Sequence, residues 1–268
     1  KQNFMDLFEN FILFDHSGGK CAKIFARNHQ YLGVNEAVES YKARKLKDGK
    51  LGVFWHTQGS GKSLSMVFFA KCLQRALSSP TIVVITDRTD LDNQLFGQFS
   101  KCADFLRQIP VQAKSRKHLS ELLNGIEANG IFFTTMQKFE EGEEPLSQRR
   151  NIIVVADEAH RSQYGLTETI DKQTGKLKIG AARMVRNALP NATYILFTAT
   201  PISFKDHSTR EVFGDYIDIY DMTQAVKDGA TRPVFYESRV INLKLDEATL
   251  QRIDAEYDQM AEEAEEYA

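Results

Sequence analysis

The chain has 268 residues, of which 42% are hydrophobic and 26% are charged, and its formal net charge is −2 at pH 7. This composition is ordinary for a globular protein and excludes an overall basic character, so any nucleic-acid surface must be local. No apolar stretch approaches the roughly 20 residues that span a bilayer, and residues 1–10 lack a signal-peptide pattern. Three widely spaced cysteines argue against a disulfide framework or a zinc site and indicate a reducing, cytoplasmic location.

Residues 1–26 mix aromatic side chains with a polar turn at residues 17–20, and we expect a linker from a preceding domain there. The first residue is Lys rather than Met, which suggests a piece of a longer protein. From residue 27 onward, apolar runs alternate with helical patterns. The expected strands are 51–55, 81–86, 131–135, 152–156 and 194–198, and the expected helices are 35–47, 62–77, 89–99, 115–127 and about 180–189. This alternation predicts an α/β fold, with a parallel sheet that has helices on both faces. Right-handed crossovers would then bring the carboxyl ends of the strands to one edge, where ligands bind.

The alternation is interrupted by an acidic turn at 140–145 and by residues 171–178, which are typical of a surface turn or a small hairpin. Beyond Gly214 the pattern weakens into a strand at 216–220, a helix at 223–227 and a strand-like run at 234–245. Residues 246–268 favour an acidic helix, either a solvated helix that leads into a further lobe or a docking helix for a partner. We therefore expect a main domain at 27–232, followed at 233–268 by a strand and an acidic helix.

Two carboxylates follow the apolar run 152–156 directly. Charged side chains are costly at the end of a buried strand unless something uses their charge. A magnesium ion and an attacking water would do so, with Asp157 holding the metal through water and Glu158 orienting or deprotonating the water. His160 follows closely, although a lone His is more often a hydrogen-bonded residue without a catalytic role. The alternative interpretation is two solvated acids in a turn.

A glycine-rich turn lies between the expected strand at 51–55 and the next helix. Its residues are Gly59, Ser60, Gly61, Lys62 and Ser63. Glycines there allow backbone N–H groups to turn inward around a phosphate, and the helix N-terminus adds its dipole. Lys62 would reach the β- and γ-phosphates of ATP, and the Ser63 hydroxyl would bind Mg²⁺. The alternative is a strand-to-helix turn with an incidental lysine.

Residues 197–201, with the sequence Phe-Thr-Ala-Thr-Pro, end the next strand. The hydroxyls of Thr198 and Thr200 could bond to the loop at 157–160 and sense the γ-phosphate. Taken alone, the same residues would be a capped strand end.

Together these motifs resemble the first RecA-like lobe of superfamily 2 helicases and translocases. Residues 56–63 are similar to motif I, in a variant where His56 replaces the first glycine. Residues 157–160 are similar to motif II and residues 198–200 to motif III. Residues 84–91 and 134–139 resemble motifs Ia and Ib, which lie on the nucleic-acid side in that family.

The resemblance adds roles for residues outside the phosphate loop. Residues 27–31 look like the adenine-reading Q motif, in which the amide of Gln30 would pair with adenine. Arg88 and Lys138, in the segments similar to motifs Ia and Ib, become candidates for contacts to DNA phosphates.

Three segments narrow the resemblance to the motor (R) subunit of type I restriction enzymes. They are residues 55–63, residues 157–165 with Arg-Ser-Gln-Tyr-Gly at 161–165, and residues 188–192. In that family the R subunit uses ATP to pump double-stranded DNA past a recognition site bound by the methyltransferase (M) and specificity (S) subunits, and a separate nuclease domain cuts. The resemblance covers residues 27–240 and implies ATP and Mg²⁺ as cofactors.

Two parts of such a motor are not recognised in the chain. Residues 1–26 are too few for the nuclease domain, and no Asp…Glu-x-Lys pattern is convincing. The second RecA-like lobe, which supplies arginines to the γ-phosphate, is not replaced by Arg210, Arg232 or Arg239. We therefore expect half of a motor. The alternatives are another helicase or chromatin-type remodeller, against which residues 161–165 argue, and a fragment that binds nucleotide without turnover.

Overall fold

The structure is a computed structural model that describes residues 2–16, 19–75, 79–86, 89–139, 144–157, 168–170, 177–201, 203–204 and 207–233. Residues 1–232 form one compact unit. The strand expected at 234–245 and the acidic helix expected at 246–268 lie outside the described residues. The domain boundaries stay a prediction.

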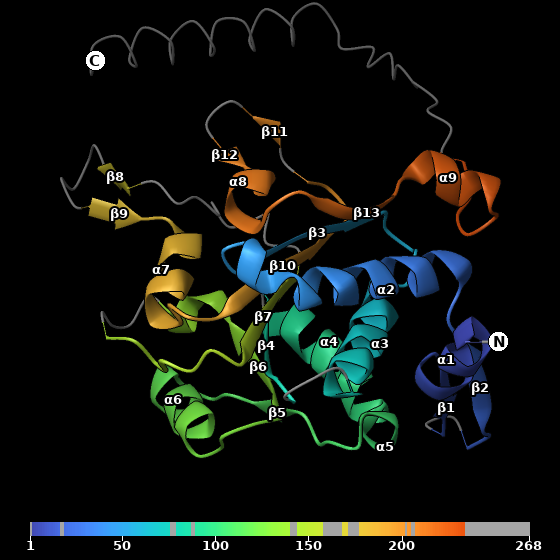
Figure 1. Ribbon diagram of the computed structural model, residues 1–268, viewed down its shortest axis with the longest axis horizontal. Coiled ribbons are helices and arrows are strands. Elements are labelled where there is room, and N and C mark those ends of the chain that lie inside the picture. Colours follow the sequence, from blue (N-terminus) through green and yellow to red (C-terminus); the bar gives the residue numbers. More distant parts are fainter. Residues whose placement is uncertain are drawn as a thin grey trace, which may run out of the picture. The chain divides into compact units, whose positions relative to one another are not determined.

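Seven parallel strands form the central sheet, in the order β13-β3-β10-β7-β4-β6-β5 (Figure 1). The strands are β3 (Lys50–His56), β4 (Thr81–Thr86), β5 (Val111–Gln112), β6 (Ile131–Thr135), β7 (Ile152–Asp157), β10 (Thr193–Thr198) and β13 (Tyr216–Tyr220). The predicted RecA-like parallel sheet is confirmed. The two-residue strand β5 was not expected, because a pair of residues carries no detectable periodicity.

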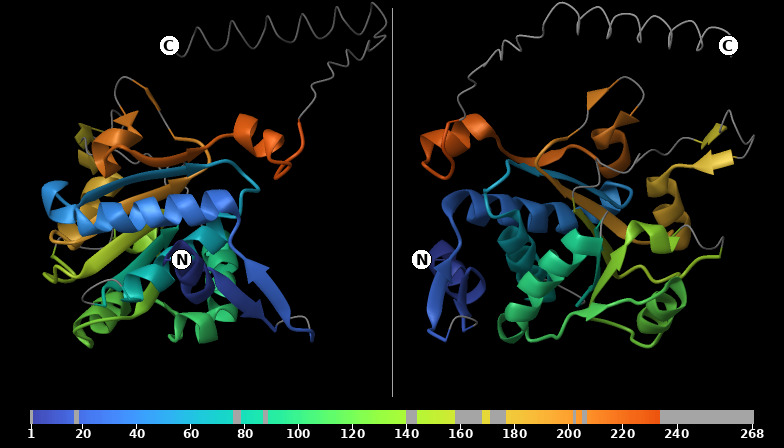
Figure 2. Two further views of the ribbon diagram at one scale, coloured as in Figure 1. Left: turned by 45° about the vertical axis from the view of Figure 1, so that its right-hand side comes forward. Right: turned by 180° about the vertical axis from the view of Figure 1, so that it is seen from behind.

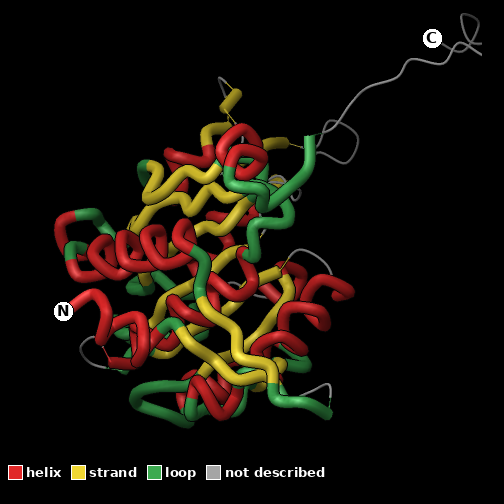
Figure 3. The backbone as a smooth tube through the Cα atoms, turned by 90° about the vertical axis from the view of Figure 1, so that its right-hand side faces the viewer, coloured by secondary structure: helices red, strands yellow, loops and turns green. Residues whose placement is uncertain are grey.

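Helices cover both faces of this sheet, as predicted (Figures 1 and 2). One apolar cluster joins the sheet to α2 (Asn28–Lys42), α3 (Lys62–Arg75), α4 (Thr89–Lys101) and α5 (Ala103–Leu106). The other joins it to α6 (Arg116–Asn124), α7 (Ala181–Ala188), α8 (Thr209–Phe213) and the 3₁₀ turn η2 (Met136–Phe139). The tube view in Figure 3 shows the helices lying on both sides of the central strands.

Strand β7 shows why the sequence folds in this way. Ile153 and Val155 pack into the first cluster, whereas Ile152, Val154 and Ala156 pack into the second. Successive side chains of a strand point to opposite faces, so a run without polar residues requires cover on both. Each large side chain buried in this way contributes roughly 1.5–3 kcal/mol of transfer free energy. The strand therefore lies in the middle of the sheet. Its last residue, Asp157, is fixed at the edge formed by the carboxyl ends of the strands.

The N-terminal residues form more local structure than the expected linker. Helix α1 (Gln2–Asn10) precedes an antiparallel pair, β1 (Ile12–Asp15) and β2 (Ala22–Phe25). Phe11 is fully buried, and its ring centroid lies 5.5 Å from that of Phe68 in α3. This segment therefore packs on the main core through Phe11 and Leu13, with Leu7 and Ile24 against it. Their role as a connection to a preceding domain stays a prediction.

Helix α2 begins at Asn28, seven residues before the predicted start. Its first turn is polar but buried, with His29 at 9% and Gln30 at 2% exposure. Hydrophobic periodicity does not detect buried polar residues, which explains the difference. The helix continues into the 3₁₀ turn η1 (Arg44–Leu46).

The remaining elements are small. Strands β8 (Glu168–Ile170) and β9 (Leu177–Ile179) pair antiparallel on either side of residues 171–176, and β11 (Ser203–Phe204) pairs with β12 (His207–Ser208). Residues 171–176 lie outside the described residues, so the surface turn or small hairpin expected at 171–178 stays a prediction. Helix α9 (Met222–Lys227) follows β13 and is capped by the carboxylate of Asp221. No helix in the described part of the chain has the length and apolar character needed to cross a membrane.

Candidate nucleotide-binding site

The register of the sheet brings the ends of three strands, β3, β7 and β10, into one row. Thr198 of β10 pairs with Trp55 of β3, and Phe197 of β10 pairs with Asp157 of β7. Parallel strands in register end at the same edge. The segment after β3, the acid at the end of β7 and the threonines at the end of β10 therefore meet at the carboxyl edge of the sheet, where open α/β folds bind ligands.

The phosphate loop, residues 56–63, turns sharply at its two glycines. Gly59 has φ = +81° and Gly61 has φ = +88°, a region that residues with a side chain rarely adopt. A Cβ at Gly61 would lie 2.7 Å from the amide nitrogen of Gln30. The backbone angle therefore favours glycine at 61, and a side chain there would also have to displace the Gln30 amide.

Several groups of this loop suit an anion. Ser60 is 1% exposed, and its Oγ has no hydrogen-bond partner among the described residues. Lys62 opens helix α3, which runs for 14 residues, and its Nζ donates to the carbonyl of His56 at 3.1 Å. Ser63 is exposed in the first turn of α3. A buried hydroxyl without a partner, a helix N-terminus and an ammonium group at one turn fit a polyphosphate.

Gln30 lies against the loop, and each end of its side-chain amide makes a hydrogen bond. Its Oε1 accepts from the backbone N–H of Arg27 at 2.8 Å, and its Nε2 donates to the carbonyl of Gly61 at 3.0 Å. Gln30 thus joins the start of α2 to the phosphate loop. Contact of Gln30 with adenine stays a prediction.

His56, in place of the usual first glycine, is completely buried. Its Nε2 lies 2.7 Å from Oδ2 of Asp218 in β13. Burial lowers the pKa of His56, against the smaller opposing effect of the Asp218 carboxylate. The ring bonds Asp218 and its centroid lies 4.0 Å from that of the Phe54 ring, on the face of the sheet that α2 covers. The loss of this glycine is therefore compatible with an open loop.

Strand β13 supports the other side of the loop through Tyr220. The carbonyl of Tyr220 accepts from the N–H of Thr57 at 2.9 Å. The Tyr220 ring stacks on His29, with centroids 3.9 Å apart and planes at 11°, and its hydroxyl donates to Asp228 at 3.1 Å. Nothing in the sequence pattern of residues 216–228 indicates this role, because the contact joins residues about 190 positions apart.

Trp55 connects the phosphate-loop strand to the threonine segment. Its indole Nε1 donates to the carbonyl of Ala199 at 3.0 Å. Thr198 is fully buried and its Oγ1 accepts from the N–H of Thr200 at 3.1 Å, whereas Thr200 is exposed. The structure thus places both predicted threonines at the sheet edge, beside the strand that leads into the loop.

The acidic residues are described in part. Asp157 is the last residue of β7 and is half-buried at the same edge. Glu158, His160, the segment 161–165 and Arg88 lie outside the described residues. Their predicted roles therefore stay predictions, as do those of Lys62, Ser63 and Asp157 in binding ATP and Mg²⁺.

Lys138, the other candidate for contact with DNA, lies in the turn η2 after β6. Its ammonium donates to the carbonyl of Ala113. This bond occupies one of the three donors of the ammonium group. It also directs the side chain towards the end of β5.

Sequence reasoning missed three residues of this site: His29, Trp55 and Tyr220. Two of them were within quoted motifs, since His29 precedes Gln30 and Trp55 precedes His56. Their positions next to motif residues were a usable signal. Tyr220 left no such signal.

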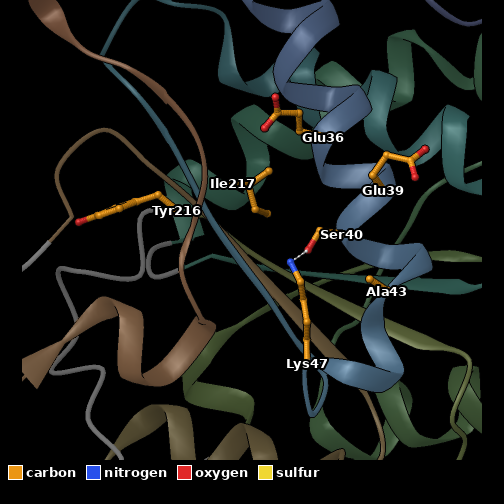
Figure 4. Close-up of a pocket in the computed structure, with 7 residues that line it drawn as sticks. All are labelled: Glu36, Glu39, Ser40, Ala43, Lys47, Tyr216 and Ile217. Atoms are coloured by element: carbon orange, nitrogen blue, oxygen red, sulfur yellow. Dashed lines mark hydrogen bonds between the residues drawn. The ribbon is translucent and has the colours of Figure 1, made fainter.

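A hollow of about 420 Å³ lies elsewhere, between α2 and β13 (Figure 4). Lys47 donates to Ser40 there at 2.7 Å, and Ser40 donates to the carbonyl of Leu51 at 2.5 Å. Its lining contains no residue of the phosphate loop. The lining residues are Glu36, Glu39, Ser40, Ala43, Lys47, Tyr216 and Ile217.

A RecA-like parallel sheet with a glycine-rich loop between its strand β3 and helix α3 defines the class of P-loop nucleotide-binding lobes. The chain belongs to the SWI2/SNF2 ATPase family, whose profile matches residues 29–268.

Curated relatives make the assignment more specific. The chain is 48% identical over 272 residues to the type I restriction enzyme HindI endonuclease subunit of Haemophilus influenzae, an alignment that covers 98% of this chain and 26% of that protein. It is 38% identical over 274 residues to the putative type I restriction enzyme MjaIXP endonuclease subunit of Methanocaldococcus jannaschii, covering 98% and 24%. The chain thus spans about a quarter of the length of these relatives. The resemblance to type I restriction subunits is confirmed.

Among solved structures, the ATP-dependent Type ISP restriction-modification enzyme LlaBIII bound to DNA is similar in fold. The TM-score is 0.50 at 16% identity, over 76% of this chain and 16% of that one. At this identity the likeness shows the fold alone.

Proposed function

We propose that this chain is the first ATP-binding lobe of a double-stranded DNA translocase, in the R subunit of a cytoplasmic type I restriction endonuclease. The observation that carries the proposal is the meeting of the phosphate loop and Asp157 at one sheet edge. The family match to ATPases and the names of the relatives support it. A nuclease domain and a second lobe belong to the whole protein in this proposal, as do the methyltransferase and specificity subunits as partners.

The residues have distinct roles in this proposal. The loop N–H groups and Lys62 bind the β- and γ-phosphates, and Gln30 orients the loop and reads adenine. Ser63 and Asp157 would hold Mg²⁺, which neutralises phosphate charge when bound. Glu158 orients or deprotonates the water that attacks the γ-phosphate. Thr198, Thr200 and His160 couple the state of the γ-phosphate to the DNA-binding side.

The DNA contacts in this proposal are to the backbone, because a translocase must move on any sequence. Lys138 and Arg88 are the residues assigned to phosphates. Lys138 lies in η2, immediately after the carboxyl end of β6, and this position supports its assignment to a DNA phosphate. Replacing either residue should weaken DNA binding equally on different sequences and reduce its salt dependence.

Lys62→Ala in the full-length protein tests the nucleotide site. We expect loss of ATP turnover and of translocation with the fold retained. Lys42→Ala, on the outer part of α2, is a matched control that should keep both activities. Normal turnover by Lys62→Ala would contradict the assignment of the loop.

Glu158→Gln tests the hydrolytic step separately from binding. We expect ATP to bind normally and single-turnover hydrolysis to slow by about 10²–10⁴, the usual contribution of general acid–base catalysis. A wild-type hydrolysis rate would remove Glu158 from the mechanism.

Movement on DNA is tested by displacement of a third strand from intact duplex. A restriction-type translocase displaces it without separating the duplex, whereas a helicase produces single strands.

The isolated chain should bind ATP weakly and show negligible DNA-stimulated turnover, because arginines from a second lobe contribute roughly 10³–10⁵ in rate where such fingers act.

A further inference from the structure

His29 contacts the phosphate loop through the carbonyl of Ser60. Its Nε2 lies 2.9 Å from the carbonyl oxygen of Ser60. A carbonyl oxygen can only accept a hydrogen bond, so the hydrogen of the ring must be on Nε2. The bond is buried and links α2 to the centre of the loop, 31 positions along the chain.

Because the peptide bond is planar, the contact between His29 and the Ser60 carbonyl also sets the direction of the Gly61 N–H. The Ser60 carbonyl and the Gly61 N–H belong to the same trans peptide unit, in which the two groups point in opposite directions. When His29 holds the carbonyl towards α2, the Gly61 N–H must point to the other side. No acceptor in the described part of the chain bonds this N–H. An oriented, unpaired N–H is the group with which such loops bind a phosphate.

The His29 ring is itself held in place by two aromatic neighbours. It stacks face to face on Tyr220, and its centroid lies 5.5 Å from that of His56 in an edge-on arrangement. Tyr220 is anchored by its hydroxyl bond to Asp228 and by its carbonyl bond to Thr57. Burial lowers the pKa of His29, which keeps the imidazole neutral at neutral pH. The ring therefore has little freedom to rotate away from Ser60.

The neighbouring Gln30 cannot replace this contact. Its amide bonds the Gly61 carbonyl, which the N–H groups of Leu64 and Ser65 at the start of α3 also bond, at 3.0 and 3.1 Å. That carbonyl is fixed by the helix in any case. Within the described residues, no other donor bonds the Ser60 carbonyl.

We propose that His29 is a positioning residue of the nucleotide site, which through its Nε2–H turns the Gly61 N–H towards a bound polyphosphate. This inference rests on the proposed function, since it needs a phosphate in the loop. It gives a role, and a required tautomer, to a residue to which the resemblance assigned none.

The first test compares two substitutions in the 268-residue chain. His29→Phe keeps a ring that can stack on Tyr220 but removes the donor, whereas His29→Gln places an amide Nε2 near the lost ring nitrogen. Binding of Mg·ATP and of Mg·tripolyphosphate would be measured by calorimetry, with melting temperatures to verify folding. We expect His29→Phe to weaken both about three- to tenfold, the range for one hydrogen bond, and His29→Gln to bind within about twofold of wild type.

The use of tripolyphosphate separates loop positioning from adenine contacts, because it has no base. A loss confined to ATP would overturn the inference, as would wild-type affinity in His29→Phe. If wild type binds neither ligand, or if Lys62→Ala binds both normally, the proposed function itself fails. The two failures are therefore distinguishable.

A second measurement needs no substitution. Nitrogen-15 NMR of histidine-labelled wild-type chain reports which ring nitrogen carries the hydrogen. We expect a neutral His29 protonated on Nε2. A hydrogen on Nδ1 alone would exclude the bond to Ser60 and overturn the inference, even if His29→Phe fails to fold.

Discussion

The indole of Trp55 donates a hydrogen bond to the carbonyl of Ala199 at 3.0 Å, and so joins strand β3 to the segment that follows β10. Trp55 directly precedes His56, whose carbonyl oxygen accepts a hydrogen bond from the ammonium group of Lys62. One strand end thus contacts both the phosphate loop and the threonine segment 198–200. A displacement of the phosphate loop would therefore be transmitted through the end of β3 to the threonine segment, and the reverse also holds.

Trp55→Phe should therefore separate binding from turnover. Phe keeps most of the ring but cannot donate to Ala199. We expect ATP affinity within about threefold of wild type, a stability loss of about 0.5–1.5 kcal/mol for one hydrogen bond, and a several-fold lower turnover number in the full-length protein. Nucleotide titration and steady-state kinetics measure the two quantities. An unchanged turnover number would show that the bond to Ala199 is only structural.

Trp55 is the single tryptophan of the chain. Its half-buried indole lies at the sheet edge beside the loop. Adding Mg·ATP to the wild-type chain should therefore shift its tryptophan emission, with a midpoint equal to the calorimetric dissociation constant. Lys62→Ala should show no shift at the same concentrations.

Gly61→Ala should destroy the phosphate loop at small cost to the fold. Alanine at a positive φ costs about 1–2 kcal/mol, and its Cβ would lie 2.7 Å from the Gln30 amide nitrogen. We expect loss of ATP binding with a modest fall in melting temperature.

The matched control is Gly97→Ala in the interior of α4, where a Cβ meets nothing within 4 Å. It should bind ATP normally and gain about 0.5–1 kcal/mol, because alanine is the better helix former. Equal loss of binding in both variants would argue against a special role for Gly61.

Acid should destabilise the site through His29 and His56. Burial lowers the pKa of both below the unfolded value of about 6.5. The unfolded chain then binds protons more readily, so this contribution to stability is complete above pH 6.5 and is lost as the pH falls through the folded pKa. Melting temperatures between pH 7.5 and 5.5 should fall, less steeply in His29→Gln. An identical slope in wild type and His29→Gln would contradict the prediction.

The three cysteines should differ sharply in reactivity. Cys21 is exposed, whereas burial raises the pKa of Cys72 to about 12 and also raises that of Cys102. Thiolates are the reactive form, so a disulfide reagent at pH 8 should label one thiol quickly and the other two only on unfolding. Cys21→Ser should remove the fast phase. Fast labelling of two thiols would show that the interior opens near α3 or α4.

Much of the fold followed from local sequence patterns. The apolar run at 152–156 required burial on both faces, and the structure places β7 between β10 and β4. The start of α2 could not be predicted in this way, because His29 and Gln30 are buried by bonds to the loop. Their burial depends on residues 31 positions away.

The sequence by itself predicted the chemistry of the candidate site. Glycines before a Lys-Ser pair, and acids after a buried strand, have few other uses, and the alternation of apolar strands with helices predicted a parallel sheet. The tertiary structure alone decided what holds the loop in shape. His29, Trp55 and Tyr220 act through contacts between distant segments, and such contacts leave no local periodicity in the sequence.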